Sequence, residues 1–322
     1  MKNIFIKILI NVLILIILLL FLDFIAFYLW RASFDKSYKT NLLKYISSSV
    51  EMYRDIGHSP FINKEKLGDV LINSENYRPV ENPDAEPVIV IFGCSFAYGA
   101  WLGDDETFSH LLAKETGYKV INRAVGAGSV QHMLYQLENE NFYKIIPKAD
   151  YVIYVYMYDQ IKRTYLPNIH WNRTVYYKKT KDNNLNLKKF SINYANNSII
   201  GYFAAWICEK FGIASEKDLD FYFLHITQSI ENIKKHWGND TKVILLYYPY
   251  GNDNKDDEKY VYDLEKQGVI VVKTEYFSSN DYVDLKYKIS PDDFHPNKLA
   301  WEEITPLFVK YMNKQGYLLP NK

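Results

Sequence analysis

Three side chains in two distant parts of the chain are of the types that acyl-transfer chemistry needs. Ser95 comes directly after an apolar run, Val88–Phe92, and the pair Gly93-Cys94. Asp292 and His295 stand far downstream as an Asp-x-x-His sequence. Open α/β sheets place reactive groups at the carboxyl ends of buried strands. An imidazole can take the proton of a hydroxyl there, and a carboxylate can hold the imidazole. The pattern predicts a serine nucleophile, Ser95, with His295 as base and Asp292 as its partner.

Each of these assignments has an alternative. Cys94 carries a thiol that could itself be the nucleophile. Successive side chains of a strand point to opposite faces, so Cys94 and Ser95 cannot both face one site, and we favour Ser95. Asp293 is the other candidate partner of His295, although the spacing of three favours Asp292. Without the later histidine, the sequence would indicate that Ser95 is an ordinary turn or helix-capping serine.

The elements that must position these residues follow an alternating pattern. Strands rich in Val, Ile and Tyr, without polar alternation, are typical of a parallel sheet buried on both faces. The expected strands are Val88–Phe92, Lys119–Asn122, Tyr151–Tyr156, Lys242–Tyr247 and Gly268–Lys273. The expected helices are Thr107–Thr116, Val130–Lys144, Leu219–Trp237, Asp256–Lys266 and Lys298–Asn313. The sequence predicts a three-layer α/β/α domain with a central parallel five-stranded sheet.

Residues 161–211 interrupt this alternation. The basic, polar stretch Tyr176–Tyr194 predicts a β-hairpin, and Ile199–Phe211 predicts a helix. Such an insertion could cover the strand ends or merely decorate the surface. We therefore expect a globular domain over 87–318 with an insertion at about 161–211, preceded by a connector over 32–86 with a short helix at Leu42–Tyr53.

The amino-terminal segment, residues 1–31, has a different composition. Ile8–Trp30 is interrupted only by Asn11 and Asp23. At 1.5 Å per residue it spans about 35 Å, enough for a hydrocarbon core of about 30 Å. No convincing small-x-small cleavage site follows, so we expect an uncleaved signal anchor and a transmembrane helix. The globular part is expected outside the cytoplasm.

Composition and motifs argue against several other classes of protein. Lys+Arg and Asp+Glu are both 38, so no net charge favours nucleic acid. The 7 histidines are scattered without a metal-binding spacing, and no glycine-rich nucleotide fingerprint is present. We expect no metal and no cofactor. The two cysteines, Cys94 and Cys208, do not make a disulfide framework.

The motifs resemble those of the SGNH/GDSL hydrolase family. Gly93–Gly99, followed by Gly103–Phe108, looks like the family's first block, in which a glycine-x-serine turn ends the first strand. Asn122–Gly128 is similar to the second block, and Asp292 with His295 matches the fifth. The resemblance spans roughly residues 88–313. It implies a flavodoxin-like strand order, a Ser95-His295-Asp292 triad, and an oxyanion hole made by the N–H groups of Ser95 and Gly126. Gly128 is the alternative donor.

The family's third block is not present in its usual form. That block supplies an Asn side chain after the third strand, whereas this chain continues with Tyr158, Asp159, Gln160 and, further on, Arg163. Asp159 is an anion and a poor donor, whereas the Gln160 amide could donate. Arg163 could bind an anionic or glycan group, or pair with Asp159. These three residues are the candidate substrate-binding positions.

Two function classes follow. The first is a membrane-anchored ester hydrolase or acyltransferase that forms an acyl-Ser95 intermediate on an acylated small molecule, glycan or lipid of the cell envelope. The 29 Tyr and 6 Trp, where exposed, would suit stacking on sugars. The second class is a non-catalytic, membrane-tethered glycan-binding or assembly protein on the same fold, because a fold does not by itself imply an activity.

Overall fold

The structure is a computed structural model of the whole chain. The residues it describes are 2–37, 77–126, 128–157, 160–161, 164, 176–180, 182, 184–188, 215–249, 258–291 and 293–318. The chain forms two compact units. One comprises residues 1–51, 166–172 and 191–215, and it contains helix α1 (Lys2–Ser37). The other comprises residues 52–165, 173–190 and 216–322, and it contains the sheet and the candidate site.

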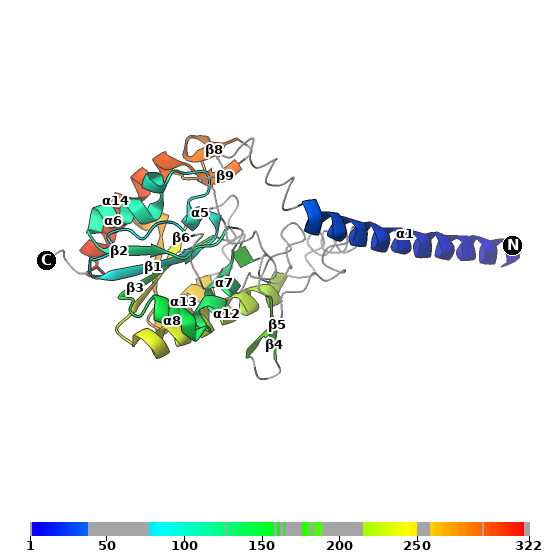
Figure 1. Ribbon diagram of the computed structural model, residues 1–322, viewed down its shortest axis with the longest axis horizontal. Helices are drawn as coiled ribbons and strands as arrows, with labels where there is room; N and C mark the ends of the chain where they lie inside the picture. The colour runs from blue at the N-terminus through cyan, green and yellow to red at the C-terminus, as the bar shows by residue number, and fades with distance from the viewer. Residues whose placement is uncertain are drawn as a thin grey trace. The chain divides into compact units, whose positions relative to one another are not determined.

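The larger unit is built on a five-stranded parallel sheet of order β2-β1-β3-β6-β7 (Figure 1). Its strands are β1 (Val88–Gly93), β2 (Lys119–Asn122), β3 (Tyr151–Tyr156), β6 (Lys242–Tyr247) and β7 (Ile270–Lys273). The expected strands and the flavodoxin-like order are confirmed. Every residue of β1 and β3 is buried, as their continuous apolar sequences predict.

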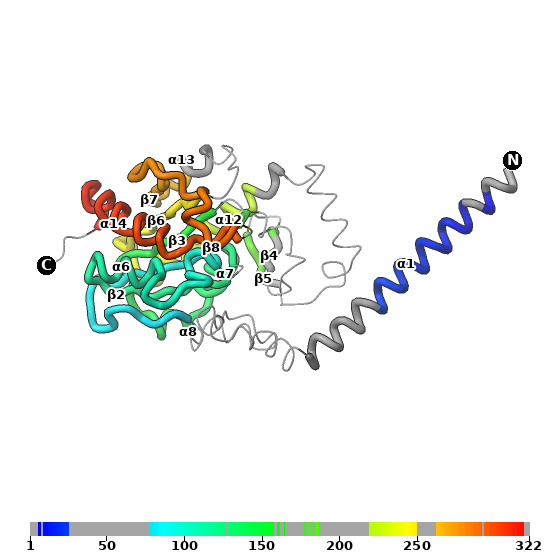
Figure 2. Tube along the Cα trace, turned by 90° about the horizontal axis from the view of Figure 1, so that it is seen from above, coloured from blue at the N-terminus to red at the C-terminus, as the bar shows by residue number. Residues whose placement is uncertain are grey.

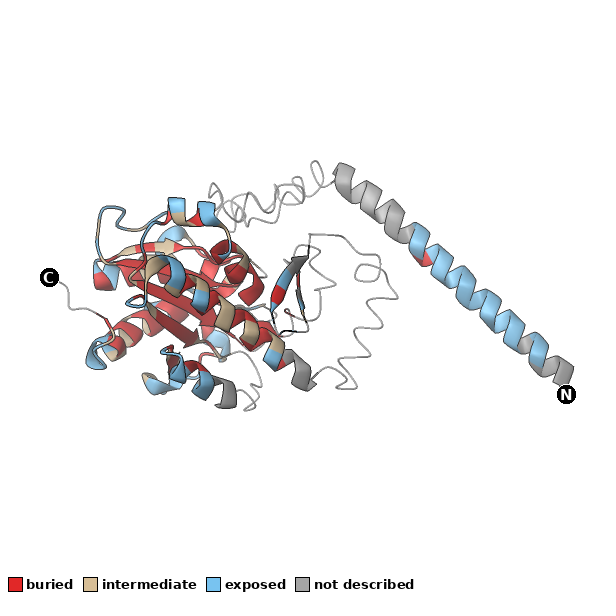
Figure 3. Ribbon diagram, turned by 90° about the horizontal axis from the view of Figure 1, so that it is seen from below, coloured by how far each residue is buried: buried red, intermediate tan, exposed pale blue. Residues whose placement is uncertain are grey.

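Helices cover both faces of this sheet. On one face, Ile89 and Ile91 pack with α5 (Ser95–Tyr98), α6 (Phe108–Thr116) and α14 (Lys298–Lys314). On the other face, Val88, Val90 and Phe92 pack with α7 (Val130–Leu137), α8 (Glu140–Ile145), α12 (Ser215–Trp237) and α13 (Glu258–Lys266). The alternation of β1 side chains between the two cores makes the three layers. Buried residues gather in the sheet and on the helix faces turned toward it (Figure 3).

The predicted helix Val130–Lys144 is in fact two helices. α7 ends at Leu137 and α8 begins at Glu140, with Asn139 between them. The Asn139 side chain accepts a hydrogen bond from the Asn141 N–H at 3.0 Å and so caps the second helix. Asn is a preferred cap because its short side chain reaches a free helical N–H. The hydrophobic period alone could not place this break.

The hairpin expected in the insertion is present. Strands β4 (Tyr176–Lys179) and β5 (Leu185–Lys188) pair antiparallel. Tyr177 is buried, and its hydroxyl donates to the Glu138 carboxylate at 2.6 Å. This contact fastens the hairpin to the end of α7. The helices predicted at Leu42–Tyr53 and Ile199–Phe211 lie outside the described residues.

Short elements complete the carboxyl-terminal part. The 3-10 helices η5 (Thr274–Tyr276) and η6 (Leu285–Tyr287) follow β7. Strands β8 (Lys288–Ser290) and β9 (Asp293–Pro296) then pair antiparallel (Figure 1) and lead directly into α14. β8 and α14 lie in the orange-to-red part of the chain trace (Figure 2). The Asn297 side chain caps α14 by accepting from the Ala300 N–H at 3.1 Å. β9 is therefore fixed at both its paired edge and its helical end.

Across the part of the chain that the structure describes, no helix is both long enough and apolar enough to cross a membrane.

Candidate active site

Ser95 lies in a tight turn at the carboxyl end of β1. Gly93 ends the strand with φ +153°, and a Cβ at this position would lie 2.7 Å from Ala97 Cβ and 3.0 Å from the Val155 carbonyl oxygen. Only glycine avoids both the conformational strain and the clash. Ser95 then begins the short helix α5 and is only partly buried. The turn thus presents a hydroxyl at the edge of the sheet, as the sequence predicts.

His295 reaches this hydroxyl from β9. Its Nε2 lies 2.7 Å from Ser95 Oγ. Its Nδ1 lies 2.5 Å from Asp293 Oδ1. A carboxylate can only accept, so Nδ1 carries the proton and Nε2 is left to accept from the serine O–H. The three side chains therefore form a continuous line from hydroxyl to imidazole to carboxylate, which is the arrangement of a nucleophile, a base and a group that orients the base.

The carboxylate that contacts His295 among the described residues is that of Asp293. In the extended strand β9, side chains alternate, so residues 293 and 295 lie on the same side. Asp293 Oδ1 also accepts from the backbone N–H of His295 at 3.0 Å. The sequence analysis favoured Asp292 and named Asp293 as the alternative, and the contacts that the structure describes are those of Asp293. Asp292 itself lies outside the described residues.

Cys94 is turned away from this line of side chains. It is fully buried, and its sulfur lies 3.3 Å from the sulfur of Met157, which is also buried. The alternation between Cys94 and Ser95 that the sequence analysis used is present in the structure. The thiol belongs to the core beneath α5, and the hydroxyl faces the histidine.

The turn after β2 lies against the end of β1. The Arg123 N–H donates to the Ile91 carbonyl at 2.7 Å, and the Val125 N–H donates to the Gly93 carbonyl at 3.1 Å. Gly126, the expected oxyanion donor, therefore follows Val125, whose N–H is bonded to the turn that carries Ser95. The Gly128 N–H donates to the Val125 carbonyl at 2.7 Å, so this alternative donor is already engaged.

Of the candidate substrate-binding residues after β3, Gln160 is among the described residues. Gln160 is fully buried in the core. Its Oε1 accepts from the Tyr154 hydroxyl at 2.5 Å, and its Nε2 donates to the Val155 carbonyl at 3.2 Å. Burial and these contacts make Gln160 part of the core. Asp159 and Arg163 lie outside the described residues.

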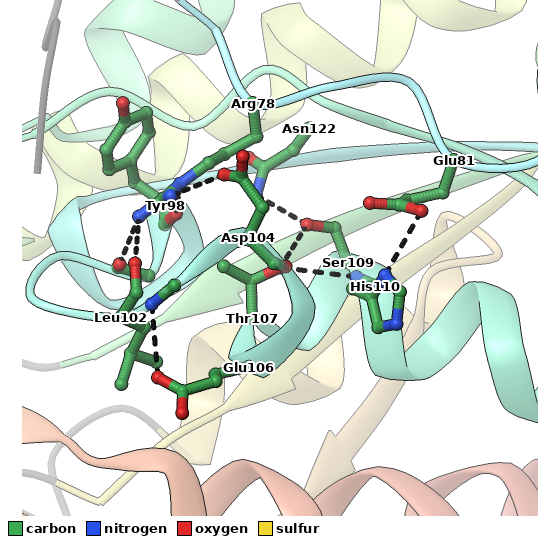
Figure 4. Close-up of polar contacts among 12 residues, drawn as sticks. Arg78, Glu81, Tyr98, Leu102, Asp104, Glu106, Thr107, Ser109, His110 and Asn122 are labelled. Atoms are coloured by element: carbon green, nitrogen blue, oxygen red, sulfur yellow. Dashed lines mark hydrogen bonds and ion pairs between the residues drawn. The ribbon is translucent and has the colours of Figure 1, made fainter. Parts of the chain in front are cut away.

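Arg78 is a residue near the site that the sequence analysis did not single out. It lies in the expected connector and is almost completely buried. Its guanidinium donates to the carbonyls of Tyr98 (3.1 Å), Gly99 (2.6 Å) and Leu102 (2.9 Å), and to the Asp104 carboxylate at 2.6 Å (Figure 4). One cation thus fixes the loop that follows α5. A lone Arg in a polar, Pro-containing stretch gives no signal of such a role.

Further polar contacts tie this loop to both sides of the site. The 3-10 helix η3 (Asp104–Glu106) follows the loop, and the Glu106 carboxylate accepts from the Gly103 N–H at 3.1 Å and pairs with Lys298 at 3.3 Å. The Asn122 side chain donates to the Ala97 carbonyl at 2.8 Å and to Ser109 Oγ at 3.1 Å (Figure 4). Glu106 therefore joins the loop after the nucleophile to the helix that begins just after His295.

The site holds no cluster suited to a metal. Among the described residues, no group of three or more His, Cys, Asp or Glu side chains could hold a metal ion. The side chains that do converge are a hydroxyl, an imidazole and a carboxylate, which are competent for proton and acyl transfer.

Comparison with known proteins yields structural likeness only. No family model matches the chain, and no curated protein matches it. It is similar to an acetyl xylan esterase from the rumen bacterium Butyrivibrio proteoclasticus, at 12% identity and a TM-score of 0.44, over 74% of this chain and 66% of the other. A lipase from a goat rumen metagenome is 13% identical with a TM-score of 0.42, over 70% of this chain and 97% of the other. A salicylyl-acyltransferase from a tetracycline biosynthetic pathway is 14% identical with a TM-score of 0.41, over 73% and 56%. Similarity at this level assigns no activity, so the functional argument rests on this chain's own side chains.

Proposed function

We propose that this protein is a serine-dependent enzyme of acyl esters, either a hydrolase or an O-acyltransferase of the SGNH/GDSL type. The observation that carries the proposal is the 2.7 Å contact between Ser95 Oγ and His295 Nε2, with Asp293 on the far side of the imidazole. Ser95 and His295 are 200 residues apart in the chain. A purely structural role, as a surface histidine or a helix-capping serine, would not require this contact.

The chemistry begins with proton transfer. His295 Nε2 takes the proton of Ser95 Oγ as the oxygen attacks the ester carbonyl, and the resulting imidazolium is stabilised by Asp293. The imidazolium then gives the proton to the departing alkoxide, and the acyl group remains on Ser95. A water molecule or an acceptor hydroxyl, deprotonated in turn by His295, attacks the acyl-serine. The imidazolium returns this proton to Ser95 Oγ as the bond to the acyl group breaks, which releases the acyl product and restores the free hydroxyl.

Two backbone N–H groups are proposed to bind the oxyanion. Ser95 is the first residue of α5, where the N–H groups have no partner within the helix. Gly126 lies beside the nucleophile turn because its neighbour Val125 is bonded to Gly93. Each such donor contributes about 2.7–4 kcal/mol to lowering the barrier. The family's third donor, an Asn after the third strand, has no equivalent among the described residues, since Gln160 is committed to the core.

The substrate and the location of the enzyme belong to the same proposal. We place the acyl group, for which acetyl is the first candidate, on a cell-envelope glycan or lipid. Support comes from the amino-terminal sequence Ile8–Trp30, which is interrupted only by Asn11 and Asp23. The anchor proposed at this segment places the globular domain outside the cytoplasm. The domain limits 1–31, 32–86 and 87–318 are proposed with it.

The competing function is a non-catalytic glycan-binding or assembly protein on this fold. The altered third block favours it, since one oxyanion donor is replaced. The two functions are separated by turnover of p-nitrophenyl acetate by the full chain, with Ser95→Ala and His295→Ala as controls. The proposal expects turnover that both substitutions abolish. Turnover that survives Ser95→Ala would refute the nucleophile, and binding of a glycan without turnover of any acylated form would favour the alternative.

A further inference from the structure

The ring of His295 is held by two hydrogen bonds and is packed against a neighbouring ring. Its two nitrogens, at opposite edges, contact Asp293 and Ser95. Contacts at the edges fix the position of the nitrogens but allow the ring to roll about the line that joins them. Phe96 packs against the imidazole, with the two ring centroids 5.0 Å apart and the planes tilted at 51°. Phe96 therefore restrains the motion that the hydrogen bonds leave open.

Phe96 is itself tightly packed in the core. Its side chain is 3% exposed. The rings of Phe96 and Tyr248 pack edge to face, with centroids 5.5 Å apart and planes at 85°. Tyr248 packs on Trp301 of α14 at 5.4 Å, and Trp301 is completely buried. A row of rings thus runs from the imidazole into the core. α14 supports His295 twice, since it follows β9 in the chain and carries Trp301 at the end of the row.

We infer that Phe96 is a positioning residue for His295 in the reaction proposed above, on which this inference rests. Phe96 follows Ser95 directly, so the same short helix supplies the nucleophile and the surface against which its base is packed. The face of an aromatic ring is electron-rich and attracts a cation within about 6 Å. The ring accordingly favours the imidazolium that forms in the transition state, in addition to fixing the ring geometry.

The kinetic test compares Phe96 with a buried phenylalanine on the opposite face of the sheet. Phe142 is fully buried and packs on Phe92 at 6.0 Å, remote from His295 in the other core. We expect Phe96→Ala to lower kcat by about 10- to 100-fold with KM within about threefold, because a small misplacement of a catalytic group costs up to about 10²-fold. Phe96→Leu should recover most of kcat. Phe142→Ala, a comparable cavity mutant, should keep kcat within about threefold at a temperature where all variants are folded.

A spectroscopic measurement separates this inference from the proposed activity. The Nδ1 proton shared by His295 and Asp293 should give a low-field proton resonance that is absent in His295→Gln. We expect Phe96→Ala to broaden or abolish this resonance and Phe142→Ala to retain it, whether or not the wild-type chain turns over an ester. A wild-type chain without esterase activity but with this Phe96-dependent resonance would refute the function and leave the positioning role intact. Retention of both kcat and the resonance in Phe96→Ala, or equal losses in Phe142→Ala, would refute the positioning role.

Discussion

Asp293 holds His295 through two hydrogen bonds that come from the same residue. Its Oδ1 accepts from the backbone N–H of His295 at 3.0 Å and from Nδ1 of the ring at 2.5 Å. The backbone contact fixes the carboxylate before the ring is placed, and the ring contact then selects the tautomer whose Nε2 can accept from Ser95. A local turn of three residues thus preorganises the base.

Asp293→Asn should therefore be far more damaging than Asp292→Asn. An amide at 293 can donate to Nδ1, which favours the tautomer with its proton on Nε2 and removes the base. In the serine-protease case used as a template, this change costs about 10⁴ in kcat. We expect a loss of about 10²–10⁴ for Asp293→Asn and less than about threefold for Asp292→Asn in p-nitrophenyl acetate turnover. The reverse order of effects would return the role to Asp292.

We expect Gln160 to contribute to the stability of the core and not to catalysis. Its amide joins the Tyr154 hydroxyl to the Val155 carbonyl, and the Tyr222 hydroxyl lies 3.4 Å from the same amide oxygen. Gln160→Ala should lower the free energy of unfolding by about 1–3 kcal/mol, because it leaves buried groups without partners. At a temperature where the variant is folded, kcat should change less than about threefold. A specific loss of kcat with unchanged unfolding in urea would instead restore Gln160 to the oxyanion site.

The layers of this fold could be predicted from the sequence because its strands are continuous apolar runs. β2, β3 and β6 have the predicted bounds, and every residue of the continuous run Tyr151–Tyr156 is buried. The break at Asn139 could not be predicted, because a hydrophobic period persists across a capped interruption. Likewise, the contact between Ser95 and His295 follows from two motifs, whereas the choice between Asp292 and Asp293 depends on the backbone of β9 being extended.

The Arg78 contacts lay beyond sequence reasoning for a different reason. Three of its four partners are backbone carbonyls, at Tyr98, Gly99 and Leu102, and carbonyls have no sequence signature. Contacts between a buried guanidinium and backbone carbonyls can be identified only from the three-dimensional course of the loop.

Arg78→Met should destabilise the fold and Arg78→Lys should not fully repair it. The planar guanidinium reaches four acceptors at once, and an ammonium lacks that geometry. Removing it leaves carbonyls of the buried loop without donors, so we expect a loss of about 3 kcal/mol in the free energy of unfolding. Urea unfolding followed by tryptophan fluorescence measures it. A loss below about 0.5 kcal/mol, the usual range for a surface substitution, would show that the loop does not depend on Arg78.

His225 should make stability depend on pH. It is fully buried in α12, where burial lowers its pKa from 6.5 to about 4 against a smaller opposing effect of the Phe221 carbonyl. Below about pH 6.5 the unfolded chain takes up a proton that the folded chain does not, so stability falls as pH decreases toward 4. From about pH 7 to about pH 4.5 this residue should remove about 2 kcal/mol of stability.

Two substitutions test the contribution of this histidine. In His225→Phe, the difference in urea midpoint between about pH 7 and about pH 4.5 should decrease by the amount that corresponds to about 2 kcal/mol. In His236→Gln, which alters the exposed penultimate residue of the same helix, this difference should not change. An unchanged pH dependence in His225→Phe would show that His225 titrates alike in the folded and unfolded chain.

The central claim is that Ser95 carries the acyl group, and mass spectrometry of the chain after reaction with a fluorophosphonate tests it most directly. The account predicts one adduct, located on Ser95, formed at a similar rate in Cys94→Ala, much more slowly in His295→Ala, and not at all in Ser95→Ala. An adduct on Cys94, or labelling that persists without Ser95, would contradict it.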